Sequence, residues 1–420
     1  MDFSKYQQKI ASLILWSLIC ILIGILSGSA SALLLLSLDW VTQLFTVHKM
    51  LFWLLPVGGL IIGLLYHYLG NESNKGNNLL LMAYENPEER VPLRMGFLVF
   101  LGTLITHLLG GSAGREGTAV QMGGAIAYQF NKIKKISTKE TQILILLGIS
   151  AGFASIFGTP LAGAIFALEI VCFKRITLKS IISVFLVSFI ADYTVDIWEI
   201  KHSTYPIFII PNITFKTLLW VLVAGLLFGL TAMLYSKSAH YWNRIFRVAF
   251  PFAPCRPLVG GSFLVILFYC FDMTRYTGLG IPVIAESFTT ASLPQDFLLK
   301  IILTGITLGS GFKGGEVTPL FFIGATLGSA LSLVVPLPIS LLAGMGFVAL
   351  LSGATHTPIA CTLMGIELFG IEAGLFLCIA CSVAYLCSGS TGIYTSQLRT
   401  GLKYTMYAYC LKKIRLFRRL

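Results

Sequence analysis

The chain has 420 residues, of which 56% are hydrophobic and 11% charged, and its mean hydropathy is +0.84. Soluble domains carry about 25% charged residues, so this composition excludes a soluble enzyme and predicts one integral membrane domain, residues 1–420, in a lipid bilayer. The formal net charge of +12 is gathered at the ends of apolar segments, so no nucleic-acid partner is predicted.

Basic clusters flank the apolar segments. They comprise Lys5 and Lys9; Lys132, Lys134 and Lys135; Lys174 and Arg175; and Lys412, Lys413, Arg415, Arg418 and Arg419. Because Lys and Arg mark the cytoplasmic ends of membrane spans, we expect both termini in the cytoplasm. Residues 401–420 are expected to form a basic cytoplasmic tail at an anionic lipid surface. The first apolar run, about 10–38, is too long for a cleavable signal peptide and is expected to remain as a span.

Further apolar segments follow in chain order. They run approximately over 51–69, 95–109, 117–130, 141–157, 160–173, 177–198, 214–235, 257–271, 296–309, 317–335, 338–352, 358–370 and 371–388. Several are shorter than the roughly 20 residues that cross a bilayer, which predicts helices that stop beside a cavity inside the membrane. This pattern is typical of a transporter or channel. The cysteines and histidines show no ligand spacing, so neither a metal nor a cofactor is predicted.

One glycine-rich stretch, GGSAGREGTAVQMGG at 110–124, carries the charged pair Arg115 and Glu116 between two apolar segments. Ionisable groups at such depth usually face a water-filled path or the protein interior. Glycines allow close approach to bare N–H groups, and a helix that starts here directs unpaired N–H donors at whatever precedes it. The stretch therefore predicts an anion site. A glycine-rich turn in which Arg115 and Glu116 pair with each other is the alternative.

The sequence also repeats itself. Thr159-Pro160-Leu161-Ala162 lies upstream of Glu169 at the same spacing as Thr357-Pro358-Ile359-Ala360 lies upstream of Glu367. A second glycine cluster, GSGFKGGEVTPLFFIGATLG at 309–328, matches the stretch at 110–124, and Gly278 matches Gly76. We therefore expect two homologous repeats, residues 10–199 and 214–400, with a binding site near the membrane midplane. Glu169 and Glu367 are expected to be shared structural groups.

Three motifs resemble those of the CLC family of chloride channels and transporters. Gly114-Arg115-Glu116-Gly117-Thr118 resembles the family's GREGP signature, and Gly315-Glu316-Val317-Thr318-Pro319 resembles its GxFxP signature. Gly392-Ile393-Tyr394-Thr395 stands where the family carries its central tyrosine. The resemblance covers essentially the whole chain. It implies an all-α homodimer with a separate pore in each subunit, built as an inverted repeat of tilted and partial transmembrane helices.

The departures from these motifs resemble the fluoride-exporting branch of the family. Where the family's GSGIP signature carries a serine, this chain reads Gly76-Asn77-Asn78-Leu79-Leu80. The GLGIP string at 278–282 lies in the second repeat and is rejected as the anion motif. Thr118 replaces the family's proline, and Ile170 stands near the position of the proton-transfer glutamate of chloride exchangers. The resemblance implies one-for-one exchange of fluoride and protons at the plasma membrane of a bacterium.

Glu116 is predicted to gate the path and carry the proton, because its carboxylate competes with anions for the same place. Asn77 offers amide donors for a small ion, and Asn78 either shares this role or forms a turn. Arg115 is expected to hold the loop through backbone carbonyls, and Glu316 to point away from the path. The other residues assigned to anion binding are Gly114, Gly117, Thr118, Val317, Thr318 and Tyr394; capping remains an alternative for Thr118 and packing for Tyr394.

Two other functions stay open. A chloride/proton exchanger and a passive chloride or fluoride channel would both use the same motifs, since channels of this family can keep the glutamate. An intramembrane enzyme is not expected, because the sequence offers no nucleophile–base pair and no metal-ligand set.

Overall fold

The computed structural model describes residues 3–86, 88–133, 136–400, 403–405 and 407. Within these ranges the chain folds into helices and loops, which confirms the expectation of an all-α protein. The basic residues Lys134, Lys135, Lys412, Lys413, Arg415, Arg418 and Arg419 lie outside the described residues. So does most of the expected tail at 401–420.

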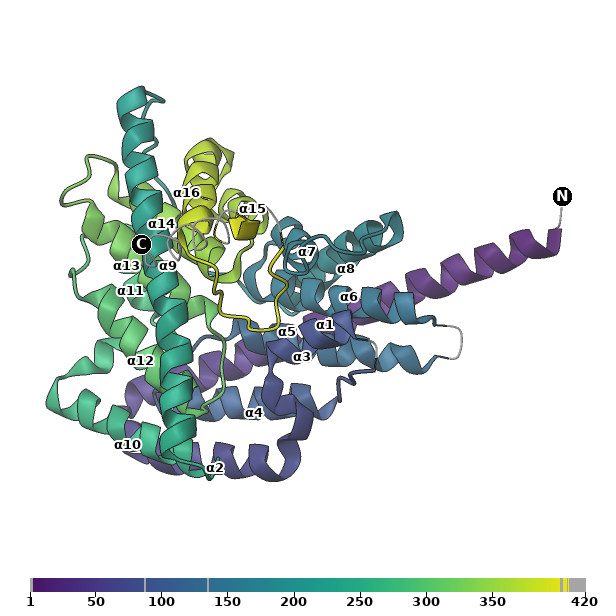
Figure 1. Ribbon diagram of the computed structural model, residues 1–420, viewed down its shortest axis with the longest axis horizontal. Helices are drawn as coiled ribbons and strands as arrows, with labels where there is room; N and C mark the ends of the chain where they lie inside the picture. The colour runs from purple at the N-terminus through teal and green to yellow at the C-terminus, as the bar shows by residue number, and fades with distance from the viewer. Residues whose placement is uncertain (1–2, 87, 134–135, 401–402, 406, 408–420) are drawn as a thin grey trace, which may run out of the picture.

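The first half of the chain contributes eight α-helices to the described structure (Figure 1). They are α1 (Phe3–Val47), α2 (Leu55–Leu65), α3 (Asn77–Glu85), α4 (Arg94–Leu108), α5 (Glu116–Tyr128), α6 (Thr138–Phe157), α7 (Pro160–Glu169) and α8 (Leu178–Ile197). Short 3₁₀ or π turns join several of them: η1 (Lys49–Leu54), η2 (Tyr66–Gly70), η3 (Asn71–Lys75) and η4 (Gln129–Lys132).

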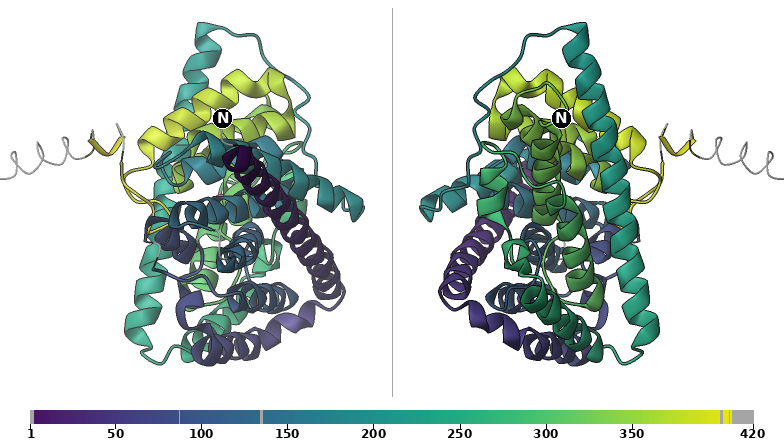
Figure 2. Two further views of the ribbon diagram at one scale, coloured as in Figure 1. Left: turned by 90° about the vertical axis from the view of Figure 1, so that its right-hand side faces the viewer. Right: turned by 90° about the vertical axis from the view of Figure 1, so that its left-hand side faces the viewer.

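The second half adds eight more in the described residues. They are α9 (Phe215–Ala249), α10 (Cys255–Cys270), α11 (Ile281–Glu286), α12 (Asp296–Ser310), α13 (Val317–Leu331), α14 (Ile339–Thr355), α15 (Pro358–Phe369) and α16 (Gly374–Cys387), with η5 (Met273–Tyr276) and η6 (Ile371–Ala373) between them. The long helices α1 and α9 lie on opposite flanks of the bundle (Figure 2).

Helix length separates the outer helices from the central ones. Five helical segments of the described chain are long and apolar enough to cross a membrane: Ile10–Val47, Lys49–Lys75, Thr138–Phe157, Leu178–Ile197 and Phe215–Ala249. The most apolar part of α1 is 33% buried inside the protein, whereas that of α6 is 78% buried. The remaining apolar helices have 10–17 residues, too few to span a bilayer. Central helices are therefore covered by protein and several of them end inside the membrane.

The two halves repeat the same close helix packing. In the first, α5 crosses α6 so tightly that a Cβ on Gly123 would meet the backbone carbonyl of Gly148. In the second, a Cβ on Gly324 of α13 would meet the carbonyl of Gly346 of α14. These matched contacts set the starts of α5 and α13 at the centre of the molecule.

Glu169 and Glu367 hold the two halves together by capping helices reciprocally. Glu169, at the end of α7, accepts hydrogen bonds from the backbone N–H groups of Ile359 (3.0 Å) and Ala360 (2.7 Å) at the start of α15. Glu367 does the same for Leu161 (2.9 Å) and Ala162 (2.8 Å) at the start of α7. Each carboxylate thus meets orphan N–H donors and the positive end of a helix.

Most elements match the expected apolar segments, with three differences. Helix α9 continues past the expected end at 235 to Ala249, through a polar stretch that includes Lys237 and Arg244. Helices α3 and α11 were not expected, because each is short and begins after a glycine rather than within a long apolar run.

Candidate functional site

The two signature loops meet at the centre of the protein. Gly114 and Gly315 form an isolated antiparallel bridge, in which each N–H donates to the other's carbonyl, at 2.7 Å and 2.6 Å. Helix α5 begins two residues after Gly114 and α13 begins two residues after Gly315. The starts of both helices, with their unpaired N–H groups, therefore lie next to each other.

Gly315 keeps the start of α5 uncovered. A Cβ there would lie 2.8 Å from the backbone nitrogen of Gly117, 3.0 Å from that of Glu116 and 3.1 Å from that of Arg115. Any side chain at this position would cover the first N–H donors of α5 or push the two loops apart. The glycines predicted from the sequence thus allow a close approach of two backbones.

Glu116 points into the space between the two helix starts. Its side chain is 2% exposed and crosses to the second repeat, where the Thr318 hydroxyl lies 2.6 Å from both carboxylate oxygens. The backbone N–H of Thr318 donates to Oε2 at 3.0 Å, and that of Arg115 donates to the same oxygen at 3.1 Å. A buried carboxylate is held here by donors aimed at a negative charge. The contact between Thr318 and Glu116 joins the two repeats.

Arg115 does not hold the loop as expected. In the described structure its Nε is buried without a hydrogen-bond partner and lies 3.8 Å from Oε1 of Glu116. Its guanidinium lines a cavity instead of binding backbone carbonyls. Since the 3.8 Å ion pair is longer than the Thr318 bonds, the glycine-rich turn closed by an Arg115–Glu116 pair describes the geometry less well than an anion site does.

Asn77 and Asn78 take different positions. A Cβ on Gly117 would lie 3.0 Å from Nδ2 of Asn77, so this amide faces the first turn of α5, and its Oδ1 is buried without a partner. Asn78 instead accepts hydrogen bonds from the Ser396 N–H (2.9 Å) and the Thr395 hydroxyl (3.2 Å). Asn77 therefore lies at the site, and Asn78 braces the loop that carries the central tyrosine.

The other residues assigned to anion binding also fall into two groups, those that lie at the site and those that support it. Tyr394 is 8% exposed and lies within electrostatic range of both Glu316 and Glu116. Val317, 3% exposed, is the first residue of α13. The Thr118 hydroxyl pairs with that of Thr103 on α4 at 2.7 Å, which ties α5 to α4. The Thr118 side chain thus bonds to α4 and not to the Glu116 carboxylate.

A cavity of about 40 Å³ adjoins Glu116 and holds a few water-sized species. Its walls combine the charged pair with residues of the 198–214 loop, α6, α11, α13, α14 and α15: Arg115, Glu116, Ile156, Phe157, His202, Ser203, Tyr205, Ile281, Ile284, Thr318, Phe321, Phe347 and Leu368. His202 and Tyr205 were missed from the sequence. Only their polar character in an otherwise apolar chain was a signal for them.

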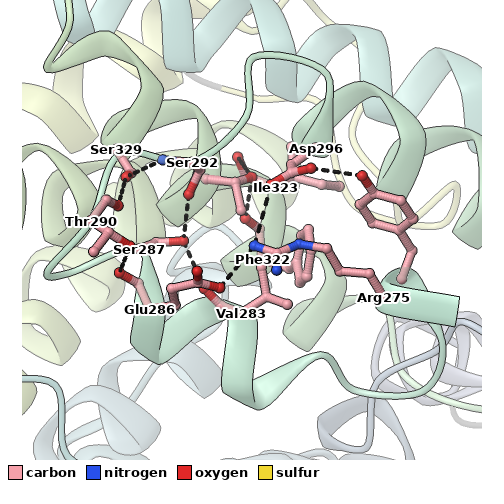
Figure 3. A network of polar contacts seen from close by, with 12 residues as sticks. Arg275, Val283, Glu286, Ser287, Thr290, Ser292, Asp296, Phe322, Ile323 and Ser329 are labelled. Carbon is pink, nitrogen blue, oxygen red and sulfur yellow. Dashed lines mark hydrogen bonds and ion pairs between the residues drawn. The ribbon is translucent and has the colours of Figure 1, made fainter. Parts of the chain in front are cut away.

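The short helix α11, which supplies Ile281 and Ile284 to this cavity, is fixed by a polar network that runs from an exposed ion pair to a buried carboxylate (Figure 3). Arg275 pairs with Glu286 at 2.8 Å and lies 3.7 Å from the fully buried Asp296. The network continues through hydroxyl groups of α11 and the loop after it: Ser287 to Ser292 (2.9 Å), and Ser329 to the backbone of Ser292 (2.9 Å) and Thr290 (2.7 Å). One wall of the cavity is thereby tied to α12 and α13.

An all-helical membrane domain that brings two helix N-termini together around one buried carboxylate defines an anion-transport protein. The sequence profile of the family described as "Voltage gated chloride channel" matches residues 58–389. The chain belongs to this family, the CLC family, as its three motifs predicted.

Individual members of the family allow a closer comparison. The chain is 43% identical over 388 residues to a "Chloride/fluoride channel protein" of Pseudomonas syringae pv. tomato, an alignment that covers 91% of this chain and 86% of that protein. A solved structure of a "CLC-type fluoride/proton antiporter" superposes with a TM-score of 0.88 at 35% identity, over 92% of this chain and 98% of the other. A "slow cyanobacterial Cl-/H+ antiporter" has a TM-score of 0.79 at 20% identity, over 95% of this chain and 98% of the other, which supports the fold alone.

Proposed function

We propose that this CLC protein exports fluoride from a bacterial cytoplasm in exchange for protons. Glu116 gates the anion path and carries the proton. The observation that carries the proposal is the place of the Glu116 carboxylate, which occupies a site built from helix N-termini and hydrogen-bond donors, where an anion would bind. A titratable group in that position supports coupling of anion movement to proton movement.

Exchange follows from competition. The ionised carboxylate accepts bonds from Thr318 and from the Arg115 backbone and fills the anion site. Protonation removes its charge and weakens these bonds, so the side chain leaves and a fluoride ion takes its place. Each departure of the carboxylate carries a proton, and each return displaces an anion. The two fluxes are coupled because both use one place.

The residues around the carboxylate suit a small, strongly hydrated anion. The Asn77 amide faces the first turn of α5, and its Oδ1 has no hydrogen-bond partner. The N–H donors of this amide replace water around the ion. Backbone N–H groups of Gly117 and Val317, in the first turns of α5 and α13, add to these donors, and Gly114 leaves room for the ion. Tyr394 supplies a phenol hydroxyl on the inner side. Thr118 supports the start of α5 through its bond to Thr103.

The name of one similar protein favours an alternative to fluoride/proton exchange. The relative from Pseudomonas is named a channel, so passive movement of chloride or fluoride is the second candidate. A chloride/proton exchanger is less favoured, because Asn77 stands where a serine would be expected for chloride. Both alternatives use the same fold.

Assembly and orientation are further parts of the proposal. We infer a homodimer with one pore in each subunit, which is the assembly that the resemblance to the CLC family implies. The repeats at 10–199 and 214–400 match the reciprocal caps of α7 and α15. Both termini are placed in the cytoplasm by the basic residues that flank the spans.

The reversal potential of purified protein in proteoliposomes tests the exchange. Under opposed fluoride and proton gradients, an antiporter reverses at a potential that depends on both ions. Glu116→Gln removes the titratable group and is expected to abolish proton movement, while Glu88→Gln, an exposed carboxylate in the loop between α3 and α4, leaves it intact. A reversal potential set by fluoride alone in the wild type would establish a channel. Proton movement that persists in Glu116→Gln would remove Glu116 from this role.

A further inference from the structure

A second, larger cavity of about 320 Å³ lies away from the transport site. It opens between η2, η3, the end of α9, the start of α10 and the loop after α12. Its lining residues are Gly63, Tyr66, His67, Asn71, Asn74, Asn243, Arg247, Ala253, Arg256, Pro257, Gly309, Ser310, Gly311 and Lys313. Figure 1 shows the lower end of α9 beside α2 and α10. Three parts of the chain that are distant in sequence, 63–74, 243–257 and 309–313, thus form one pocket.

The charges in this cavity all have one sign. Arg247, Arg256 and Lys313 line it together with the titratable His67, and no Asp or Glu is among its lining residues. None of the three cations is within ion-pair distance of a carboxylate in the described part of the chain. Such a concentration of uncompensated positive charge favours an anion.

Two of these cations are held in place. Arg256 donates from Nε to the carbonyl of Phe250 (2.8 Å) and from Nη2 to that of Pro251 (3.0 Å), which leaves its other N–H groups free of these bonds. The Lys313 ammonium lies 3.9 Å from the centre of the Tyr66 ring. Preorganised guanidinium and ammonium groups, joined by the Asn side chains of the wall, match an anion with several oxygens, such as a phosphate group.

Exposed apolar residues lie next in sequence to the residues that line the cavity. Tyr68 is 72% exposed, Leu69 52%, Val248 74% and Phe252 53%. The ring of His67 stacks edge-on against that of Phe252, with centroids 5.4 Å apart. A free phosphate ion would leave these apolar residues uncovered. A lipid covers them with its acyl chains while its phosphate contacts the cations.

The cavity lies where α9 ends and α10 begins, and basic residues gather there: Arg244, Arg247 and Arg256. The glycines of α2 pack against the start of α10, since a Cβ on Gly63 would lie 2.7 Å from the Cα of Pro254. The basic residues that flank the spans assign this face to the cytoplasm, whose leaflet carries anionic lipids.

We propose that this cavity binds the phosphate headgroup of an anionic phospholipid, with the acyl chains against Tyr68, Leu69, Val248 and Phe252. Basic pockets between transmembrane helices at the cytoplasmic face recognise such headgroups. The site also touches the transport machinery. Lys313 is two residues before Gly315, and its stem packs on α4, where a Cβ on Gly102 would lie 2.9 Å from Lys313 Cβ. A bound lipid therefore steadies the loop that leads into α13.

Native mass spectrometry of delipidated protein tests the proposal. The protein is titrated with cardiolipin, which carries two phosphates, and with phosphatidylcholine, which has no net charge. The wild type is expected to prefer cardiolipin, and Arg247→Gln or Lys313→Gln to weaken its binding by about five-fold each, since each basic group near an anionic surface contributes on that scale. Arg244→Gln is the matched control, because Arg244 is an exposed arginine one turn away on α9 that does not line the cavity.

Three results would overturn the proposal. Equal weakening by Arg244→Gln and Arg247→Gln would show a diffuse surface attraction instead of a site. Cardiolipin affinity that is unchanged in both cavity variants would place the lipid elsewhere. Displacement of cardiolipin by inorganic phosphate at the same molar concentration, lost in Arg247→Gln, would assign the cavity to a soluble anion. Retained binding of cardiolipin against inorganic phosphate supports the lipid.

Discussion

The hydroxyl of Thr318 controls how firmly the Glu116 carboxylate holds the anion site, and Thr318→Val removes it with little change in volume. A hydroxyl has one proton, so the substitution deletes one hydrogen bond to the carboxylate and leaves the two from the Thr318 and Arg115 backbones. A hydrogen bond to a charged group contributes about 1.5–3 kcal/mol. The population of the bound carboxylate should therefore fall about 10- to 150-fold relative to its other positions. In the proposed mechanism fluoride competes for the same place and is held by the Asn77 amide and the backbone N–H groups, so its apparent Kd should become tighter by up to this factor.

Isothermal titration calorimetry of fluoride binding to the solubilised protein measures this change at alkaline pH, where the carboxylate is charged. Thr326→Val is the control, because Thr326 lies on the same helix and its hydroxyl donates to the carbonyl of Phe322 at 2.7 Å. The control is expected to leave the fluoride Kd unchanged. An unchanged Kd in Thr318→Val would refute the competition between carboxylate and fluoride.

Five further substitutions address the frame of the site. Glu169→Ala deletes two bonds to the start of α15 and should destabilise the protein by about 1–3 kcal/mol, seen as a lower midpoint of thermal unfolding; Glu367→Ala should act alike, and an unaltered midpoint in both would contradict reciprocal capping. Gly315→Ala places a Cβ 2.8 Å from the nitrogen of Gly117, so fluoride efflux from proteoliposomes should fall on the order of 100-fold, and normal efflux would show that the loops can yield. Asn77→Ala should weaken fluoride binding about 10-fold in calorimetry, whereas Asn78→Ala should lower thermal stability without changing the fluoride Kd; the reverse result would exchange their roles.

The central site was readable from the sequence because its chemistry depends on local motifs. Glycines around Glu116 and the matched motif at Gly315 fixed where two helices begin, and the paired glutamates predicted a structural link between the halves. Backbone N–H groups at a helix start point forward whatever the rest of the fold does.

Features that depend on the direction of a side chain could not be predicted from the sequence. Nothing in the Asn77-Asn78 pair says which amide turns to the path, because neighbouring residues in the first turn of a helix point to different sides. Arg115 was assigned to backbone carbonyls, but its guanidinium lines a cavity whose other walls come from distant segments. The polar end of α9 was missed because it leaves the apolar environment that made its first part recognisable.

The bridge between Gly114 and Gly315 limits which motions can open the path alternately to the two sides. Many transporters built from repeats rock one half against the other around a central site. Here two backbone hydrogen bonds join the halves at that centre, and rocking would break both in a buried place, where unpaired groups are costly. Rotation of the Glu116 side chain breaks neither of them. The proposed exchange therefore needs no rearrangement of the helices, because its one moving part is the Glu116 side chain.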